Sequence, residues 1–142
     1  MRSIGRAATL LLLLLQFPAY AENEVTILVS GIGDPVGNIV VTAFDNDDDW
    51  LEKPVVEESI ALSEGMESPL PIKLSLAPGS YAFQVYHDLD GNGEMKTNFI
   101  GIPKEPTGVS NDAKGKFGPP KFKDAAVEVT AGATIEISMV EI

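Results

Sequence analysis

The sequence predicts an all-β protein: an antiparallel β-sandwich of seven strands with one long ordered loop. Three observations lead to this class. Apolar and polar residues alternate with a period of two along most of the chain. Clusters of Gly, Pro, Asp and Asn, which favour turns, separate most of the alternating segments. No segment has the period of an amphipathic helix.

Each alternating segment places its apolar residues on one face, as a strand beside a core requires. The clearest is SYAFQVYHD, in which Tyr81, Phe83 and Val85 share the face that also carries His87. We expect the polar residues between them, such as Gln84, to face water. The predicted strands are residues 24–30, 38–45, 57–63, 70–76, 80–88, 125–130 and 134–142.

Residues 1–21 are expected to be a signal peptide that is cleaved. A positively charged start, an apolar run at residues 7–15 and an Ala-Tyr-Ala motif make up the three parts of such a signal. A membrane anchor is the alternative, but the apolar run is far shorter than the roughly 20 residues that span a bilayer, and Pro18 interrupts the stretch. The expected product, residues 22–142, is a single domain without cysteines that is periplasmic or secreted.

The chain is acidic, with 21 Asp and Glu against 10 Lys and Arg and a formal charge of -11. This argues against nucleic acid as a ligand, because Lys and Arg supply most contacts to phosphates. Six of the eight lysines after residue 21 fall within residues 96–123, where only two residues are acidic. This +4 stretch either steers an anionic ligand or is an ordinary solvated face. We expect an envelope protein or a carbohydrate as the partner, and no membrane insertion after signal cleavage.

The segment HDLDGNG, residues 87–93, is the sharpest candidate for chemistry. In a calcium loop of the D-x-D-x-N-G kind, oxygens at alternate positions converge on the ion, and the Gly makes the turn. The corresponding ligands are the side chains of Asp88, Asp90 and Asn92 and the backbone carbonyl of Glu94, with Gly93 at the turn. The sequence therefore predicts calcium, or a similar hard cation, as the cofactor of this turn.

This predicted site is incomplete on local residues. Phe99 stands where a bidentate acid is usual, and no helices flank the loop, so it is not an EF-hand. The alternative is a polar turn whose Asp and Asn side chains bond only their own backbone. Further candidate ligands are His87, Asn98, Glu105 and Asp112. A second acidic group, which either holds a cation or is a solvated loop, consists of Asp45, Asp47, Asp48 and Asp49.

Two parts of the chain resemble known families. LSLAPGSYAFQVY, with a Pro-Gly turn before a strand bearing an inward Tyr, is similar to carboxypeptidase-regulatory and transthyretin-like sandwich modules. HDLDGNGEMKTNFIGIPKEPTGVSND and FGPPKFKDAAVEV resemble the bacterial exported family called domain of unknown function 2141. The resemblance implies a transthyretin-like or immunoglobulin-like sandwich in the envelope and no particular activity. Lys96 stands where that family is often acidic, which counts against a cation site carried over from the resemblance.

Residues 97–123 show no sustained alternation and form the predicted long loop. Phe99, Ile100 and Ile102 are expected to pack it on the sandwich, and four prolines to stiffen it. The loop is then either a recognition surface or a cover for a sheet edge.

The function expected from these features is that of a non-enzymatic exported module. It would bind calcium through residues 88–94 and a protein or carbohydrate through its long loop. The alternative is an envelope hydrolase that uses carboxylates and His87 on the same loops. The sequence has no G-x-S-x-G motif, and one His without Cys makes a poor zinc site.

Overall fold

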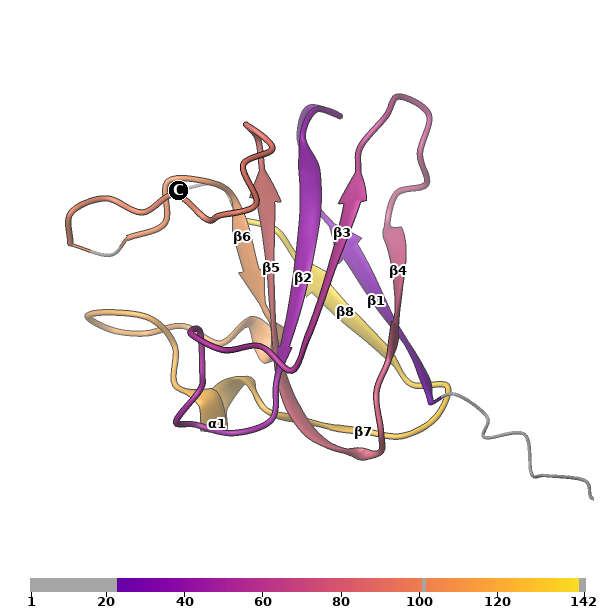
Figure 1. Ribbon diagram of the computed structural model, residues 1–142, viewed down its shortest axis with the longest axis vertical. Coiled ribbons are helices and arrows are strands. Elements are labelled where there is room, and N and C mark those ends of the chain that lie inside the picture. The colour runs from indigo at the N-terminus through magenta and orange to yellow at the C-terminus, as the bar shows by residue number, and fades with distance from the viewer. Residues whose placement is uncertain (1–22, 101, 141–142) are drawn as a thin grey trace, which may run out of the picture.

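The structure is a computed structural model that describes residues 23–100 and 102–140, so the predicted signal peptide lies outside the described residues. The described chain forms two sheets that face each other, with almost no helix (Figure 1). This confirms the prediction of an all-β fold. No helix in the described part of the chain is both long and apolar enough to cross a membrane.

The smaller sheet has three strands in the order β4, β1, β8. Their bounds are Leu70–Ser75 for β4, Glu24–Ser30 for β1 and Thr134–Ser138 for β8. β1 pairs with β4 in antiparallel orientation but with β8 in parallel orientation, Ile27 opposite Ile135. The parallel pair departs from the purely antiparallel prediction. Strands from distant parts of the chain meet here, and no hairpin joins them.

The larger sheet has five strands, and its main order is β3, β2, β5, β6. Their bounds are Val56–Ala61 for β3, Asn38–Phe44 for β2, Gly79–Asp88 for β5 and Thr107–Val109 for β6. β7, Val127–Val129, pairs with the first residues of β5. All these pairs are antiparallel, and Ile39 of β2 lies opposite His87 of β5.

β6 is an eighth strand, which alternation did not predict. It lies inside the predicted long loop and pairs with the edge of β5, Gly108 opposite Val85. A Cβ at Gly108 would come within 2.5 Å of the carbonyl oxygen of Ser138, so β6 also packs closely on β8. Part of the long loop therefore covers a sheet edge, as one of the two alternatives stated. Two short helices follow it, η1 at Ser110–Asp112 and α1 at Phe122–Ala125.

The apolar core lies between the two sheets. Its members occupy the inward positions that alternation predicts, and both sheets contribute to it. Burying these side chains stabilises the fold by about 1.5–3 kcal/mol for each large aliphatic or aromatic residue. The largest fully buried members are Phe83, Ile27, Ile39, Ile72, Leu74 and Ile137.

The outer face of β2 and β5 is also covered, which corrects the expectation that Gln84 faces water. Gln84 is only 8% exposed, and its amide nitrogen lies 4.0 Å from the sulfur of Met95. Trp50 packs edge-on against Phe44 of β2, with ring centroids 5.0 Å apart. The segments that follow β2 and β5 fold back over this face. Alternation within a strand carries no information about such a cover.

The expectation that the tip of the long loop packs on the sandwich is wrong. Its apolar side chains are exposed: Phe99 by 99%, Ile100 by 65% and Ile102 by 42%. Backbone hydrogen bonds hold this part of the loop instead, including one of 2.7 Å from the amide of Lys104 to the carbonyl oxygen of Lys96. Residues 96–100 and 102–104 therefore project from the sheets (Figure 1).

Candidate cation site

The turn after β5 is organised by Asp88, the last residue of that strand. Asp88 is fully buried, and its two carboxylate oxygens accept hydrogen bonds from the amides of Asn92 (3.2 Å) and Gly93 (2.7 Å). The side-chain oxygen of Asn92 accepts a further bond of 2.9 Å from the amide of Glu94. These are the backbone contacts that the polar-turn alternative predicts. Gly93 has a φ of +77°, as a sharp turn at this position requires.

Glu105 reaches the same turn from the other side of the long loop. It immediately precedes the segment that pairs with β5, where the amide of His87 donates to the carbonyl oxygen of Pro106 at 2.9 Å. Glu105 is 3% exposed. Its two carboxylate oxygens accept bonds from the amides of Leu89 (3.1 Å) and Lys96 (3.2 Å). The antiparallel register of β6 thus brings Glu105 beside Asp88.

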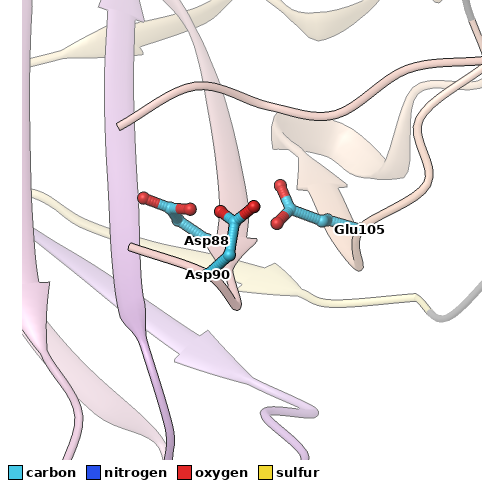
Figure 2. A group of neighbouring side chains, drawn as sticks. All are labelled: Asp88, Asp90 and Glu105. Carbon is cyan, nitrogen blue, oxygen red and sulfur yellow. The ribbon is translucent and has the colours of Figure 1, made fainter. Parts of the chain in front are cut away.

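Three carboxylates meet at this point, from Asp88, Asp90 and Glu105. One oxygen of each lies within 4.8 Å of the others. Figure 2 shows the three side chains directed toward a common space: Asp88 from the end of β5, Asp90 from the turn after it and Glu105 from the segment before β6. Two of the three are buried, whereas Asp90 is exposed. Glu105 is one of several residues that the sequence offers for the missing ligand, and its carboxylate lies beside those of Asp88 and Asp90.

Lys96 is the cation that this cluster contacts. Its ammonium donates a hydrogen bond to Asp90 and forms an ion pair with it. This bond is the main reason that the pKa of Asp90 lies below its usual value and the pKa of Lys96 lies above its usual value. Both side chains are well exposed, so the pair can open at small cost.

Tyr86 contacts the same turn through its hydroxyl group. Its hydroxyl donates a bond of 3.1 Å to the carbonyl oxygen of Gly93. Burial, and after it the charges of Glu57, Asp88 and Glu105, raise the pKa of Tyr86 to about 12.

The other predicted ligands are not in the carboxylate cluster. Glu94 belongs to the turn, where its backbone carbonyl is the predicted ligand, and its carboxylate lies outside the cluster. The side-chain oxygen of Asn98 accepts bonds from the amides of Ile100 and Ile102 within its own loop. Asp112 follows the far end of β6, away from the turn.

His87 also stays apart from the carboxylates. It is 1% exposed, and its Nε2 lies 2.6 Å from the carbonyl oxygen of Val36. Successive residues of a strand point to opposite faces, so His87 and Asp88 lie on different sides of β5. A hydrolase that combines His87 with these carboxylates therefore gains no support from the geometry.

The second acidic group lies at the other end of the larger sheet. β2 runs antiparallel to β5, with Asn38 opposite Asp88, so Asp45 follows the opposite end of β2. Asn46 donates to Asp45 at 2.7 Å and to Asp49 at 3.0 Å. Within the described ranges, three or more carboxylates gather only at Asp88, Asp90 and Glu105. The two acidic loops therefore do not form a shared site.

Two facing sheets with a carboxylate cluster at the end of β5 define a β-sandwich module with a candidate cation-binding turn. The chain belongs to the family described as an uncharacterized protein conserved in bacteria, domain of unknown function 2141, whose model matches residues 27–137. The match includes the turn, the long loop and most of both sheets. No curated protein and no solved structure matches the chain.

Proposed function

We propose that this protein is an exported, non-enzymatic β-sandwich module that binds a hard divalent cation, calcium first, through Asp88, Asp90 and Glu105. One observation carries the proposal: three carboxylates from two separate segments converge within 4.8 Å, and two of them are buried. A turn whose side chains form hydrogen bonds only with its own backbone does not require a third carboxylate, that of Glu105, beside it. The convergence across the long loop is what favours a cation over a simple polar turn.

Electrostatics gives the physical reason. Like charges at this separation repel strongly, and buried carboxylates require partners to remain ionised. Within the described ranges, Lys96 supplies the ion pair of the cluster, one positive charge against three negative ones. A divalent cation would neutralise the cluster more completely than the exposed ammonium does.

The chemistry of the donors matches calcium. Three carboxylates offer three to six oxygens, depending on whether each binds through one oxygen or two. The side chain of Asn92 and the carbonyl of Glu94 belong to the same turn and are the next candidates. Water completes such sites, and calcium takes six to eight oxygen ligands in flexible geometry. Magnesium requires a stricter octahedron and keeps more water, so calcium is the first ion to test.

Ion binding at this cluster would also order a binding loop. The amide of Lys96 donates to Glu105, and the amide of Lys104 donates to the carbonyl oxygen of Lys96, so residues 96–104 begin and end at the cluster. The exposed side chains at the tip of this loop are the surface that we propose for a protein or carbohydrate partner.

For the sandwich itself we propose the transthyretin-like arrangement. The turn at Pro78 and Gly79 leads into β5, and the hydroxyl of Tyr81 donates to the carbonyl oxygen of Ala77 at 2.8 Å. These features support the motif resemblance. An experimental structure superposed on that class tests it, and a different strand order would contradict it.

Calorimetric titration of calcium into the chelator-stripped protein tests the cation site. We expect saturable binding in the wild type. Asp90→Asn should weaken it about tenfold or more, because it removes one charge from the cluster but not the buried bonds of Asp88. Asp47→Asn, an exposed aspartate at the other end of the larger sheet, is the matched control and should leave the affinity unchanged.

Lys96→Gln provides a test of opposite sign. Since Lys96 competes with the ion for Asp90, its neutralisation should strengthen calcium binding by about tenfold. Absence of binding heat in both the wild type and Lys96→Gln, with no calcium-induced rise in melting temperature, would show that HDLDGNG is only a turn.

A further inference from the structure

A second site of strong charge lies away from the cation site, on residues 113–123, here called the lysine loop. It connects η1 with α1 and borders an open cavity of about 550 Å³. Four lysines contribute to the lining, together with one aspartate and one phenylalanine. These residues are Lys114, Lys116, Lys121, Lys123, Asp124 and Phe117.

The four lysines have no carboxylate within ion-pair distance among the residues that the structure describes. In that part of the chain, ion pairs within 4.0 Å involve only Lys73 with Glu24 and Lys96 with Asp90. The lysine loop itself contains no acidic residue. Four ammonium groups against the one carboxylate of Asp124 around this cavity favour an anionic ligand.

The side chain of Phe117 favours an anionic surface over a small free anion as the ligand of the lysine loop. Its side chain is fully exposed, between Lys116 and Gly118 at the tip of the loop. A Cβ at Gly115 would overlap the carbonyl oxygen of Gly118, so the chain turns back tightly here and presents Phe117 outward. A small anion would use the lysines and gain nothing from an exposed phenyl ring.

The base of the loop is anchored, in contrast to its tip. Phe122 packs edge-on against Trp50 with ring centroids 6.0 Å apart, and the indole nitrogen of Trp50 donates a bond of 2.8 Å to the carbonyl oxygen of Pro120. The loop therefore projects from a fixed support near α1 (Figure 1). Its exposed ring and its lysines are held in one place.

We propose that the lysine loop docks the protein on the surface of an anionic phospholipid bilayer. The lysines would contact headgroup phosphates, and Phe117 would enter the boundary between headgroups and acyl chains. A carbohydrate is a poorer fit, because sugar hydroxyls require several hydrogen-bonding groups around an aromatic ring, and Asp124 is the one lining side chain that accepts hydrogen bonds.

The charge distribution of the whole chain orients this contact. Residues 96–123 carry +4, whereas the remainder of residues 22–142 carries -17, from two lysines and 19 acidic residues. The lysines of the lysine loop would attract an anionic surface, whereas the aspartates of the acidic loop next to it would repel that surface. The contact is peripheral and needs no membrane-spanning segment. The proposal departs from the expectation of no membrane insertion only in the side chain of Phe117.

Flotation with lipid vesicles tests the proposal on residues 22–142, which include every described residue. The two vesicle types are pure phosphatidylcholine and an equimolar mixture with phosphatidylglycerol. We expect binding to the mixed vesicles, and little to the neutral ones. Lys116→Gln should weaken binding about fivefold, and Phe117→Ser on the order of tenfold.

Matched variants on the rest of the molecule are the controls. Lys73→Gln makes the same charge change on β4, and Met66→Ser removes an exposed apolar side chain from the connection between β3 and β4. Both should bind as the wild type does. Asp48→Asn, in the acidic loop that leads to Trp50, should bind more tightly because it removes an exposed negative charge.

Several results would overturn the proposal. They are no binding to either vesicle, equal binding to neutral and anionic vesicles, or an equal loss in the loop variants and their controls. Capture of a soluble anionic polysaccharide without vesicle binding would also overturn it, and would assign the loop to carbohydrate. None of these outcomes depends on calcium. A result that contradicts the membrane proposal therefore leaves the proposed cation site unaffected, and the reverse also holds.

Discussion

Gly93 occupies the turn of the candidate cation site with a φ of +77°, a conformation that L-residues with side chains rarely adopt. A Cβ built there meets no atom within 4 Å, so a side chain has space and only the backbone opposes it. Gly93→Val should destabilise the protein by about 2 kcal/mol, because a β-branched residue is strained at positive φ. Urea denaturation measures this loss.

Gly118→Val is the matched control for that substitution. Gly118 has equally open space around a Cβ and does not have a positive φ. Its replacement should change the unfolding free energy little. An equal loss in both variants would show that positive φ is not the cause.

Tyr86 makes the stability of the protein depend on pH in the alkaline range, mainly because its phenol is buried. Its pKa is raised from 10.0 to about 12, so the folded state holds a proton that the unfolded state loses first. The stabilising contribution is therefore complete below pH 10 and is lost as the pH rises from 10 toward 12.

Tyr86→Phe should flatten this loss of stability in the alkaline range. Urea midpoints of the wild type and the variant, measured from about pH 9 to about pH 12, give the comparison. Lysines titrate in the same range in both proteins, so the difference between the two curves isolates the phenol. Parallel curves would contradict the assignment.

At the scale of elements, β5 organises the larger sheet and the site. β2 pairs along one edge of it, β6 and β7 pair along its other edge, and its last residue begins the turn. Alternation predicted β5 and its inward residues from the sequence. It did not predict β6, because three residues with a central glycine carry no pattern of their own. β6 forms because the edge of β5 offers unpaired backbone groups.

Ser110 fastens the segment after β6 to β5 and to α1. It is fully buried, and its hydroxyl oxygen accepts a bond of 2.9 Å from the amide of Phe83 and donates one of 2.5 Å to the carbonyl oxygen of Ala125. Ser110→Ala should destabilise the protein by about 1–3 kcal/mol, because it leaves two buried backbone groups without that partner. Ser75→Ala, on exposed Ser75 of β4, is the control for chemical denaturation and should be nearly neutral.

At the scale of the whole molecule, the cation turn and the lysine loop occupy separate regions, and the acidic loop after β2 lies near the lysine loop through Trp50. The lysine loop is therefore apart from the carboxylate cluster but close to the aspartates of the acidic loop. The proposed cation binding and the proposed membrane contact would therefore take place at different surfaces of the domain.

The expected signal peptide determines where the exported protein would begin. We expect the protein recovered from a bacterial periplasm or medium to begin at Glu22, since Ala-Tyr-Ala precedes it. Intact-mass spectrometry measures the N-terminus. Ala21→Phe should block cleavage and leave the longer chain in the membrane fraction, because the cleavage site requires a small residue. Normal processing of that variant would contradict the predicted site.

The sequence by itself determined the all-β class, the positions of most strands, the inward residues of the core and the turn at Asp88, because these follow from patterns between near neighbours. Only the tertiary structure decided that Glu105, rather than Asn98 or Asp112, completes the carboxylate cluster. It also decided that Gln84 is covered and that the tip residue Phe99 is exposed. These facts depend on which distant segments pair and fold back. The alternation of apolar and polar residues along a strand does not predict contacts across a long loop.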